Sequence, residues 1–453
     1  MQVPFPFDSL LIFGWMSIML LIGVALRAKV PLLQKFLFPS CLIGGFLGLI
    51  LMSLDLVSLN VKDFETFAFH FFNISFISVG LTPNNPSGAP KKSKGVLRGP
   101  LWMALVEGVT LPLQAVIGGV CVILFGLVGL DLFPTFGFFA PLGFTEGPGQ
   151  ALSIGKVWEG FGFSHAATIG LTFAAIGFFF AFFVGVPLVN WGIRKGLAKH
   201  GDRDIPKDVI LGIVPRGQAK ESAGELTMHS GNVDTLAFHA ALIGLVYVLT
   251  YGVVMALGKI LPADAGKIIW GFFFFFGMGI GLMVKWIMGL LGIDHLIDSG
   301  VQRRITGWAV DYLIIATVMA IQVVVVWQYI LPISIISILC GIFTTVAVVF
   351  LGNRLDDYNL ERTVAIFGTC TGTVSSGLLL LRIVDPEFKT PVAMEIGVMN
   401  VIVVPIIVGC MVLVNAPVWW NWSVALTSAV FLGLGLVCVG LIRIFKLWGA
   451  KKV

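Results

Sequence analysis

Long apolar runs separated by short polar stretches dominate this chain and limit what it can fold into. A helix needs about 20 apolar residues to cross a bilayer. Only 12% of the 453 residues are charged, against about 25% in soluble domains, so little room remains for a soluble domain. The sequence therefore predicts an all-α polytopic membrane protein with eleven spans. They are residues 8–27, 38–54, 64–82, 99–129, 163–193, 235–261, 267–291, 309–329, 332–351, 390–414 and 421–445.

Two further stretches, 131–155 and 363–385, differ from these spans in composition. They are moderately apolar but rich in Gly, Ser, Thr and Pro. Such a composition is poor for a lipid-facing helix, because broken backbone is tolerated at membrane depth only where protein or a water-filled cavity surrounds it. We interpret both stretches as re-entrant hairpins.

The order of spans and hairpins indicates an internal repeat. Residues 1–193 contain five spans with a hairpin before the fifth, and residues 235–415 contain five more with a hairpin before the last. The polar stretch 194–234 connects the halves as a cytoplasmic loop, and 416–453 adds a span and a tail. An odd number of spans precedes the loop, so the halves are inverted. Inverted halves with glycine-interrupted segments are typical of secondary transporters with a midplane site. The alternative is a helical bundle whose symmetry is accidental.

Basic residues predict the orientation. With the N-terminus outside, 25 of the 29 Lys and Arg residues fall on the cytoplasmic face, and only Lys62, Lys156, Lys259 and Lys267 fall elsewhere. This asymmetry agrees with the positive-inside rule and also places the C-terminus inside. The net charge of +5 is thus a signal of topology, and no nucleic-acid partner is needed to explain it.

The centres of the two predicted hairpins, which we call the first tip (residues 143–152) and the second tip (residues 368–377), carry matching glycine patterns. Gly143 and Gly147 have the same spacing as Gly368 and Gly372, and small polar residues follow in both tips. A single pattern of this kind is more typical of helix packing. A matched pair in corresponding positions favours a transport site, because glycine permits sharp turns and close approach to a ligand.

The chemistry expected at such tips is that of helix ends. Amide N–H groups at a helix start attract carboxylates, while free carbonyls and hydroxyls suit Na⁺. The substrate-binding candidates are Thr145, Glu146, Gly147, Gly149, Gln150, Thr371, Gly372, Thr373, Ser375, Ser376 and Arg382. The candidate Na⁺ ligands are Asn73, Thr145, Thr369 and Asn400; the two asparagines alternatively make ordinary hydrogen bonds between helices.

Three carboxylates lie in apolar stretches, where each costs at least about 2.5 kcal/mol. Glu146 either binds Na⁺ or a substrate ammonium group, or is held by hairpin N–H groups. Glu107 is interpreted as structural, and Glu395 as either functional or placed near the membrane surface. Lys156 and Arg382 are interpreted first as anchors at the membrane face. Alternatively, Arg382 reaches a second carboxylate of the substrate.

Motifs for enzymes are absent from the sequence. It contains no His-Glu-x-x-His, no Gly-x-Ser-x-Gly and no P-loop pattern. The six cysteines and six histidines lack the spacing of metal, haem or redox sites. We therefore expect no enzyme activity and no organic cofactor.

The chain from about residue 10 to residue 415 resembles the glutamate:sodium symporter family of bacteria. The resemblance rests on both tips, on Phe38-Pro39-Ser40 through Gly44-Gly45, on Ser78-Val79-Gly80-Leu81 and on the five-plus-five layout. The first tip departs from the family's Ser-Gly-Gly-His-Gly-Thr-Gly type, and the second is poorer in glycine. The resemblance implies a homodimeric elevator transporter in the bacterial inner membrane that carries glutamate with Na⁺.

The expected function is therefore Na⁺-coupled symport of glutamate or a related amino acid or organic anion. The sequence leaves three alternatives open. The first is a carrier of a different carboxylate, the second is an ion exchanger or channel without organic substrate, and the third is a membrane scaffold that transports nothing.

Overall fold

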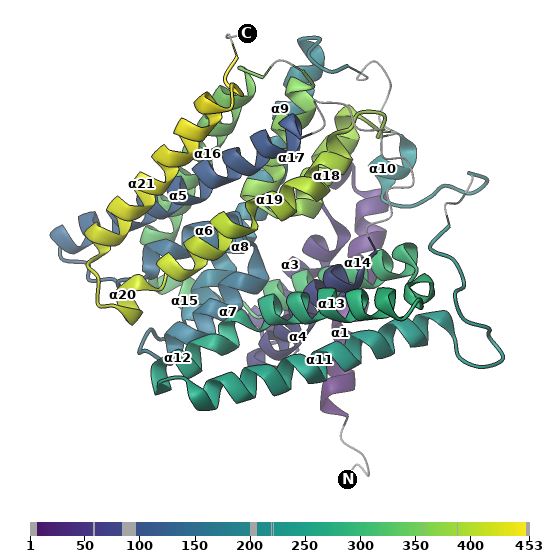
Figure 1. The fold of residues 1–453 in the computed structure, drawn as a ribbon. Helices are drawn as coiled ribbons and strands as arrows, with labels where there is room; N and C mark the ends of the chain where they lie inside the picture. The colour runs from purple at the N-terminus through teal and green to yellow at the C-terminus, as the bar shows by residue number, and fades with distance from the viewer. Residues whose placement is uncertain are drawn as a thin grey trace.

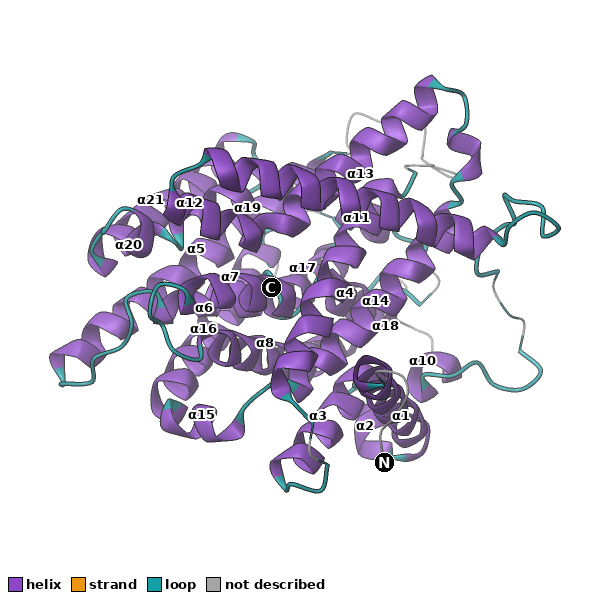
Figure 2. Cartoon of the chain, turned by 90° about the horizontal axis from the view of Figure 1, so that it is seen from below, coloured by secondary structure: helices purple, strands orange, loops and turns teal. Residues whose placement is uncertain are grey.

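A computed structural model describes residues 7–57, 59–83, 97–199, 206–218, 220, 222–355, 357–386 and 388–449. All regular elements in these residues are helices, as predicted (Figure 2). Parts of the predicted loop 194–234 and of the predicted C-terminal tail lie outside the described residues. Within the described part of that loop, the regular element is the short helix α10 (Lys207–Leu211).

The helices follow one another as two series. Before the loop they are α1 (Asp8–Lys29), α2 (Pro31–Lys35), α3 (Ser40–Ser53), α4 (Val61–Leu81), α5 (Arg98–Leu127), η1 (Phe136–Phe138), α6 (Phe139–Phe144), α7 (Pro148–Glu159), α8 (Ala166–Phe183) and α9 (Gly185–Arg194). After it they are α11 (Thr235–Ile260), α12 (Ala263–Ile268), η2 (Ile269–Phe272), α13 (Phe273–Leu290), η3 (Asp294–Leu296), α14 (Ser299–Met319), α15 (Val323–Gln328), α16 (Ile330–Gly352), α17 (Asn359–Thr371), α18 (Val374–Val384), α19 (Val392–Leu413), α20 (Ala416–Trp419) and α21 (Val424–Ile444).

Nine helical segments of the described chain are long and apolar enough to cross a membrane. They coincide with nine of the eleven predicted spans, and they support a multi-pass membrane protein. The two remaining predictions correspond to α3 and α14. Helix α3 has only 14 residues, which is shorter than the other spans.

The predicted span 309–329 is wrong in its bounds. Helix α14 begins ten residues earlier, at Ser299, where the Asp298 side chain accepts a hydrogen bond from the Val301 amide at 2.8 Å and caps the helix. The prediction placed the start too late because it followed the apolar residues, and the first turns of α14 are polar. After Met319 the helix ends, and the rest of the predicted span forms α15.

Both predicted hairpin regions fold as two helices separated by a break. Helices α6 and α7 pack against each other around residues 145–147, and α17 and α18 do so around residues 372–373. The arms differ from the predicted bounds: α7 extends to Glu159 and α17 begins at Asn359. The short helices on either side of each break leave backbone groups free at both tips.

The helices pack as two groups. The first group contains α1, α3, α4, α11, α13 and α14, and the second contains α5 to α9, α16 to α19 and α21. In both ribbon views, α11, α13 and α14 lie on one side and α5, α6 and α21 on the other (Figures 1 and 2). The groups do not follow the predicted halves 1–193 and 235–415. Instead, each half contributes three apolar helices to the first group and then a helix, a hairpin and a helix to the second.

We predict that Gly23→Val destabilises the protein far more than Gly14→Val, although both glycines lie on α1. A Cβ atom at Gly23 would overlap the carbonyl oxygen of Ser40, whereas nothing lies within 4 Å of one at Gly14. Overpacking costs on the order of 1–3 kcal/mol. Thermal unfolding in detergent should therefore give a clearly lower apparent Tm for Gly23→Val alone. Equal Tm values for the two variants would contradict this close contact of α1 and α3.

Candidate functional site

The two hairpin breaks touch each other. The Thr145 hydroxyl donates a hydrogen bond to the backbone oxygen of Cys370 at 3.2 Å. A Cβ atom at Gly147 would lie 3.0 Å from Cγ2 of Thr373, and Gly147 has a φ of +87°. Only glycine adopts that conformation readily. Glycine at position 147 therefore serves both the turn and the contact between the tips.

A buried amide on α5 links the two tips. The Gln114 side chain donates to the Cys370 backbone oxygen and to the Thr344 hydroxyl on α16, both at 3.0 Å. Its oxygen accepts a hydrogen bond from the Thr145 hydroxyl at 2.8 Å, so the single proton of that hydroxyl is shared between Gln114 and the Cys370 oxygen. Gln114 is fully buried, so these bonds form away from water, where an unmade bond is costly. One side chain thus holds both breaks against α5 and α16.

Beside the joined tips lies a cavity of about 850 Å³, which we call the tip cavity. Its lining comes from α4, α13 and α14 of the first group, from both tips with α5 and α19 of the second group, and from α12, η2 and α20 with the residues next to them. Most lining side chains are apolar. The polar lining residues are Ser75, Glu107, Thr145, Glu146, Gln150, Thr306, Thr369, Thr373, Ser375 and Asn400. No described side chain among the lining residues is basic.

Two helices start at the tip cavity without a side-chain cap. Helix α7 follows Gly147 and α18 follows Thr373, and neither residue caps its helix through a side chain. The first N–H groups of a helix have no acceptor within it, so both starts carry free donors and a partial positive charge. The first-turn residues Gly149, Gln150 and Ser375 line the cavity.

Eight of the candidate residues line the tip cavity. They are Thr145, Glu146, Gly149, Gln150, Thr369, Thr373, Ser375 and Asn400. Among the candidate Na⁺ ligands, the Thr369 hydroxyl donates to the Ala365 backbone oxygen at 3.0 Å, which leaves its lone pairs available. The structure thus brings together residues from three separate stretches of sequence.

Four other candidates shape the tips without lining the cavity; they are Gly147, Thr371, Gly372 and Ser376. The buried Thr371 hydroxyl donates to the Phe367 backbone oxygen at 2.7 Å within its own helix. A Cβ atom at Gly372 would lie 2.7 Å from Oγ of the buried Ser376. These residues are positioned to hold the second tip rather than to touch a ligand in the cavity.

The structure does not place Asn73 in the tip cavity. Its amide nitrogen donates to the Phe69 backbone oxygen at 2.8 Å within α4. Its oxygen is buried and has no hydrogen-bond partner among the described residues. Asn73 lies one residue from the cavity-lining Phe72, and the turn of the helix directs it elsewhere.

Arg382 also lies apart from the tip cavity. It is eight residues beyond the start of α18, roughly 12 Å along the helix. There it lines a second pocket of about 320 Å³ together with Arg27 and Asp208, and its guanidinium lies 5.4 Å from the centre of the Phe388 ring. The alternative in which Arg382 binds a substrate held at the tips is therefore not supported by its position.

Glu107, which was interpreted from the sequence as a structural residue, also belongs to the cavity lining. It lies on α5, is only 4% exposed and lines the tip cavity. Its Oε2 atom has no hydrogen-bond partner in the described part of the chain. The signal in the sequence was a carboxylate in the middle of an apolar helix, but the sequence did not show that this turn of α5 faces the tips.

Glu395, by contrast, has both of its carboxylate oxygens in an ion pair. Both of its oxygens accept hydrogen bonds from the Arg362 guanidinium, at 2.7 and 2.6 Å, and both side chains are buried. This bidentate pair joins α17 to α19. The geometry favours the structural alternative for Glu395.

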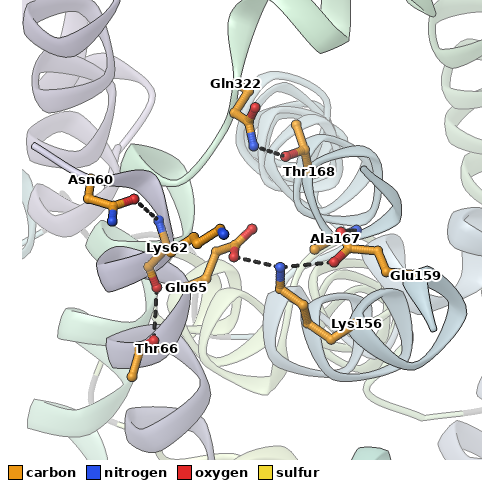
Figure 3. Close-up of polar contacts among 9 residues, drawn as sticks. All are labelled: Asn60, Lys62, Glu65, Thr66, Lys156, Glu159, Ala167, Thr168 and Gln322. Carbon is orange, nitrogen blue, oxygen red and sulfur yellow. Dashed lines mark hydrogen bonds and ion pairs between the residues drawn. The ribbon is translucent and has the colours of Figure 1, made fainter. Parts of the chain in front are cut away.

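Lys156 joins the first hairpin to the first helix group (Figure 3). Its ammonium lies 2.6 Å from the carboxylate of Glu65 on α4 and 3.0 Å from that of Glu159 on its own helix. Glu159 in turn accepts a hydrogen bond from the Ala167 amide at 3.2 Å, at the start of α8. Beside this cluster, Gln322 donates to Thr168 at 3.3 Å. Lys156 is therefore paired, and not simply extended toward a membrane face.

A scan of protein-family models gives no match to the chain, and a search of curated proteins gives none either. Within the described residues, no group of three or more His, Cys, Asp or Glu side chains is arranged to hold a metal ion. A Na⁺ site built mainly from hydroxyl and backbone oxygens requires no such group.

We expect Gln114→Leu to loosen the joined tips. The change removes the hydrogen bonds of Gln114 to Cys370, Thr145 and Thr344. It leaves the buried Thr344 hydroxyl without this donor, at a cost of roughly 1–3 kcal/mol, and leaves the direct Thr145–Cys370 bond as the remaining polar link between the tips. In variants that keep Cys370 as the single cysteine, maleimide should label this buried thiol faster after Gln114→Leu. The exposed Gln328 provides a control, since Gln328→Leu should leave labelling unchanged. Unchanged labelling in both would show that Gln114 does not hold the tips.

A double-mutant cycle tests the bridge between the groups. Glu65→Gln and Lys156→Gln should each lower the free energy of unfolding, and the double variant should be little worse than either single variant. Because Lys156 is partly exposed, the coupling free energy should be on the order of 1 kcal/mol. Unfolding in detergent measures all four proteins, and strictly additive losses would exclude the pairing.

Proposed function

We propose that the chain is a secondary transporter whose cargo binds in the tip cavity. The observation that carries this proposal is the meeting of two broken hairpins beside an 850 Å³ cavity that lies between two helix groups. Substrate sites of secondary transporters are built from discontinuous helices of this kind. The cavity is also large enough for a small organic molecule.

The packing supports an elevator mechanism with inverted repeats. Each chain half supplies three apolar helices to the first group and a helix, a hairpin and a helix to the second, which is the order expected of a duplicated unit. Both tips belong to the second group, whereas α4, α13 and α14 of the first group complete the cavity. In the proposed mechanism, the second group carries the cargo past the first.

More particularly, we propose Na⁺-coupled symport of an amino acid or related organic anion, with glutamate as the first substrate to test. The uncapped starts of α7 and α18 suit a carboxylate. The carboxylate of Glu146 suits a cation, either Na⁺ or a substrate ammonium group, and the hydroxyls of Thr145 and Thr373 add oxygen ligands for Na⁺. The resemblance to the glutamate:sodium symporter family supports the same assignment, including a homodimer.

The proposed location is the bacterial inner membrane, with the N-terminus outside and the C-terminus in the cytoplasm. The nine apolar helices support insertion into a membrane, and the distribution of basic residues supports this orientation.

Ion exchange without an organic substrate is the second candidate. The carboxylates of Glu107 and Glu146 in the cavity favour it, because they provide cation ligands without any organic cargo. The two candidates differ in one measurable respect: only a symporter accumulates an organic substrate against its gradient.

Proteoliposomes with an inward Na⁺ gradient should accumulate labelled glutamate or another amino acid, and Gly147→Val should reduce uptake at least tenfold. Valine at position 147 would crowd Thr373 and require an unfavourable positive φ. Uptake that does not depend on Na⁺ would contradict the coupling.

Gly162→Val is the matched control for this test. Gly162 also has a positive φ, of +94°, but nothing lies within 4 Å of a Cβ atom there. It therefore carries the same backbone strain without the contact between tips, and uptake should remain near the wild-type rate. If both variants transport equally well, the tips are not the site.

A further inference from the structure

The tip cavity contains two acidic side chains whose oxygens are incompletely paired. Glu107 on α5 is 4% exposed, and its Oε2 has no partner among the described residues. Glu146 in the first tip receives one hydrogen bond from Gln150 at 3.3 Å, and its Oε1 is buried without a partner. The hydroxyl of Thr373, on the opposite tip, is likewise unpartnered. Three acceptors from three elements thus face one cavity.

Their charges are close enough to interact, and no positive side chain offsets them in the described lining. Glu107 and Glu146 line the same cavity, and their carboxyl groups lie near enough for a charge on one to repel a charge on the other. The walls from α4 and α14 contribute Ser75 and Thr306 as their polar residues, which carry no charge. Two unpaired carboxylates at this depth are strongly unfavourable unless a cation or proton accompanies them.

The cavity lining offers two kinds of polar group, N–H donors and carboxylate acceptors. The uncapped starts of α7 and α18 present N–H donors, which suit an anionic group. Glu107 and Glu146 present acceptors only, because an ionised carboxylate has no proton to donate. A positive charge therefore belongs at the carboxylates, beside the place where a substrate carboxylate fits the helix starts.

We propose that Glu107 and Glu146 together bind one monovalent cation in the tip cavity, with the hydroxyl of Thr373 as an additional oxygen ligand. The inference rests on the proposed transport function only in treating this cavity as the cargo site. The cation comes from one of two sources, Na⁺ or a proton, which have the same charge but different ligand requirements. In either case, removing one carboxylate removes half of the negative charge that attracts it.

Cation binding by the purified full-length protein tests this proposal without any transport. In the Na⁺ arm, binding of radioactive ²²Na⁺ is measured at pH 8 with choline as the replacement ion. In the proton arm, the apparent Tm is measured between pH 5 and pH 9 in choline buffer alone. We expect saturable ²²Na⁺ binding, or a Tm that rises toward acidic pH, and we expect Glu107→Gln and Glu146→Gln each to weaken that response at least tenfold.

Asp131→Asn is the matched control, because it removes a carboxylate from an exposed loop residue outside the cavity. This variant should respond as the wild type does. If neither arm shows a response, or if both Gln variants respond like the wild type, the proposal is overturned. If a Gln variant fails to fold, Glu107→Asp is used instead, because it keeps the charge but shortens the side chain. Glu107→Asp should weaken the response at least threefold. A response equal to that of the wild type would overturn the proposal.

Transport assays separate this inference from the proposed function. Normal amino-acid accumulation by both Gln variants would contradict the proposed cation site and leave the proposed transport function standing. If cation binding depends on the two carboxylates but the protein accumulates no organic substrate, the proposed cation site stands and the proposed symport is contradicted.

Discussion

The structure depends on how backbone groups are satisfied where helices break among apolar surroundings. Each hairpin break leaves N–H and C=O groups without partners in their own helix, and lipid offers none. The chain meets part of this requirement by bringing the breaks together with a buried amide, Gln114, between them, so that the Cys370 carbonyl is paired while the starts of α7 and α18 stay uncapped. The contact of the tips, the cavity beside them and the free helix starts all follow from that arrangement.

The sequence predicted the coarse architecture well because it depends on composition and length. Apolar runs identified the helices, and glycine-rich interruptions identified both hairpins. The bounds of α14 were wrong because a polar first turn, capped by Asp298, has no hydropathy signal. Sorting of the helices into two groups could not be predicted, since it depends on long-range packing between the chain halves.

Within the site, the sequence identified the residues next to the breaks and Asn400 on α19, but it missed other residues that approach from elsewhere. Thr145, Gln150 and Thr373 were found from the tips themselves. Glu107 and Gln114 were not, because their importance comes from the turn of α5 that faces the tips. The alternative role of Arg382 at the substrate is not supported for the opposite reason: Arg382 is near a tip in sequence, but it lies in the last turn of α18 and lines the second pocket.

The amide of Gln114 has a consequence for how the cavity can open. Because it bonds to the first tip, to the second tip and to α16, a motion that lifts either hairpin alone must break hydrogen bonds in a buried place. A motion that carries α5, α16 and both hairpins as one body leaves all of them intact. Opening the cavity by moving one hairpin alone therefore has a higher free-energy cost than moving α5, α16 and both hairpins as one rigid body.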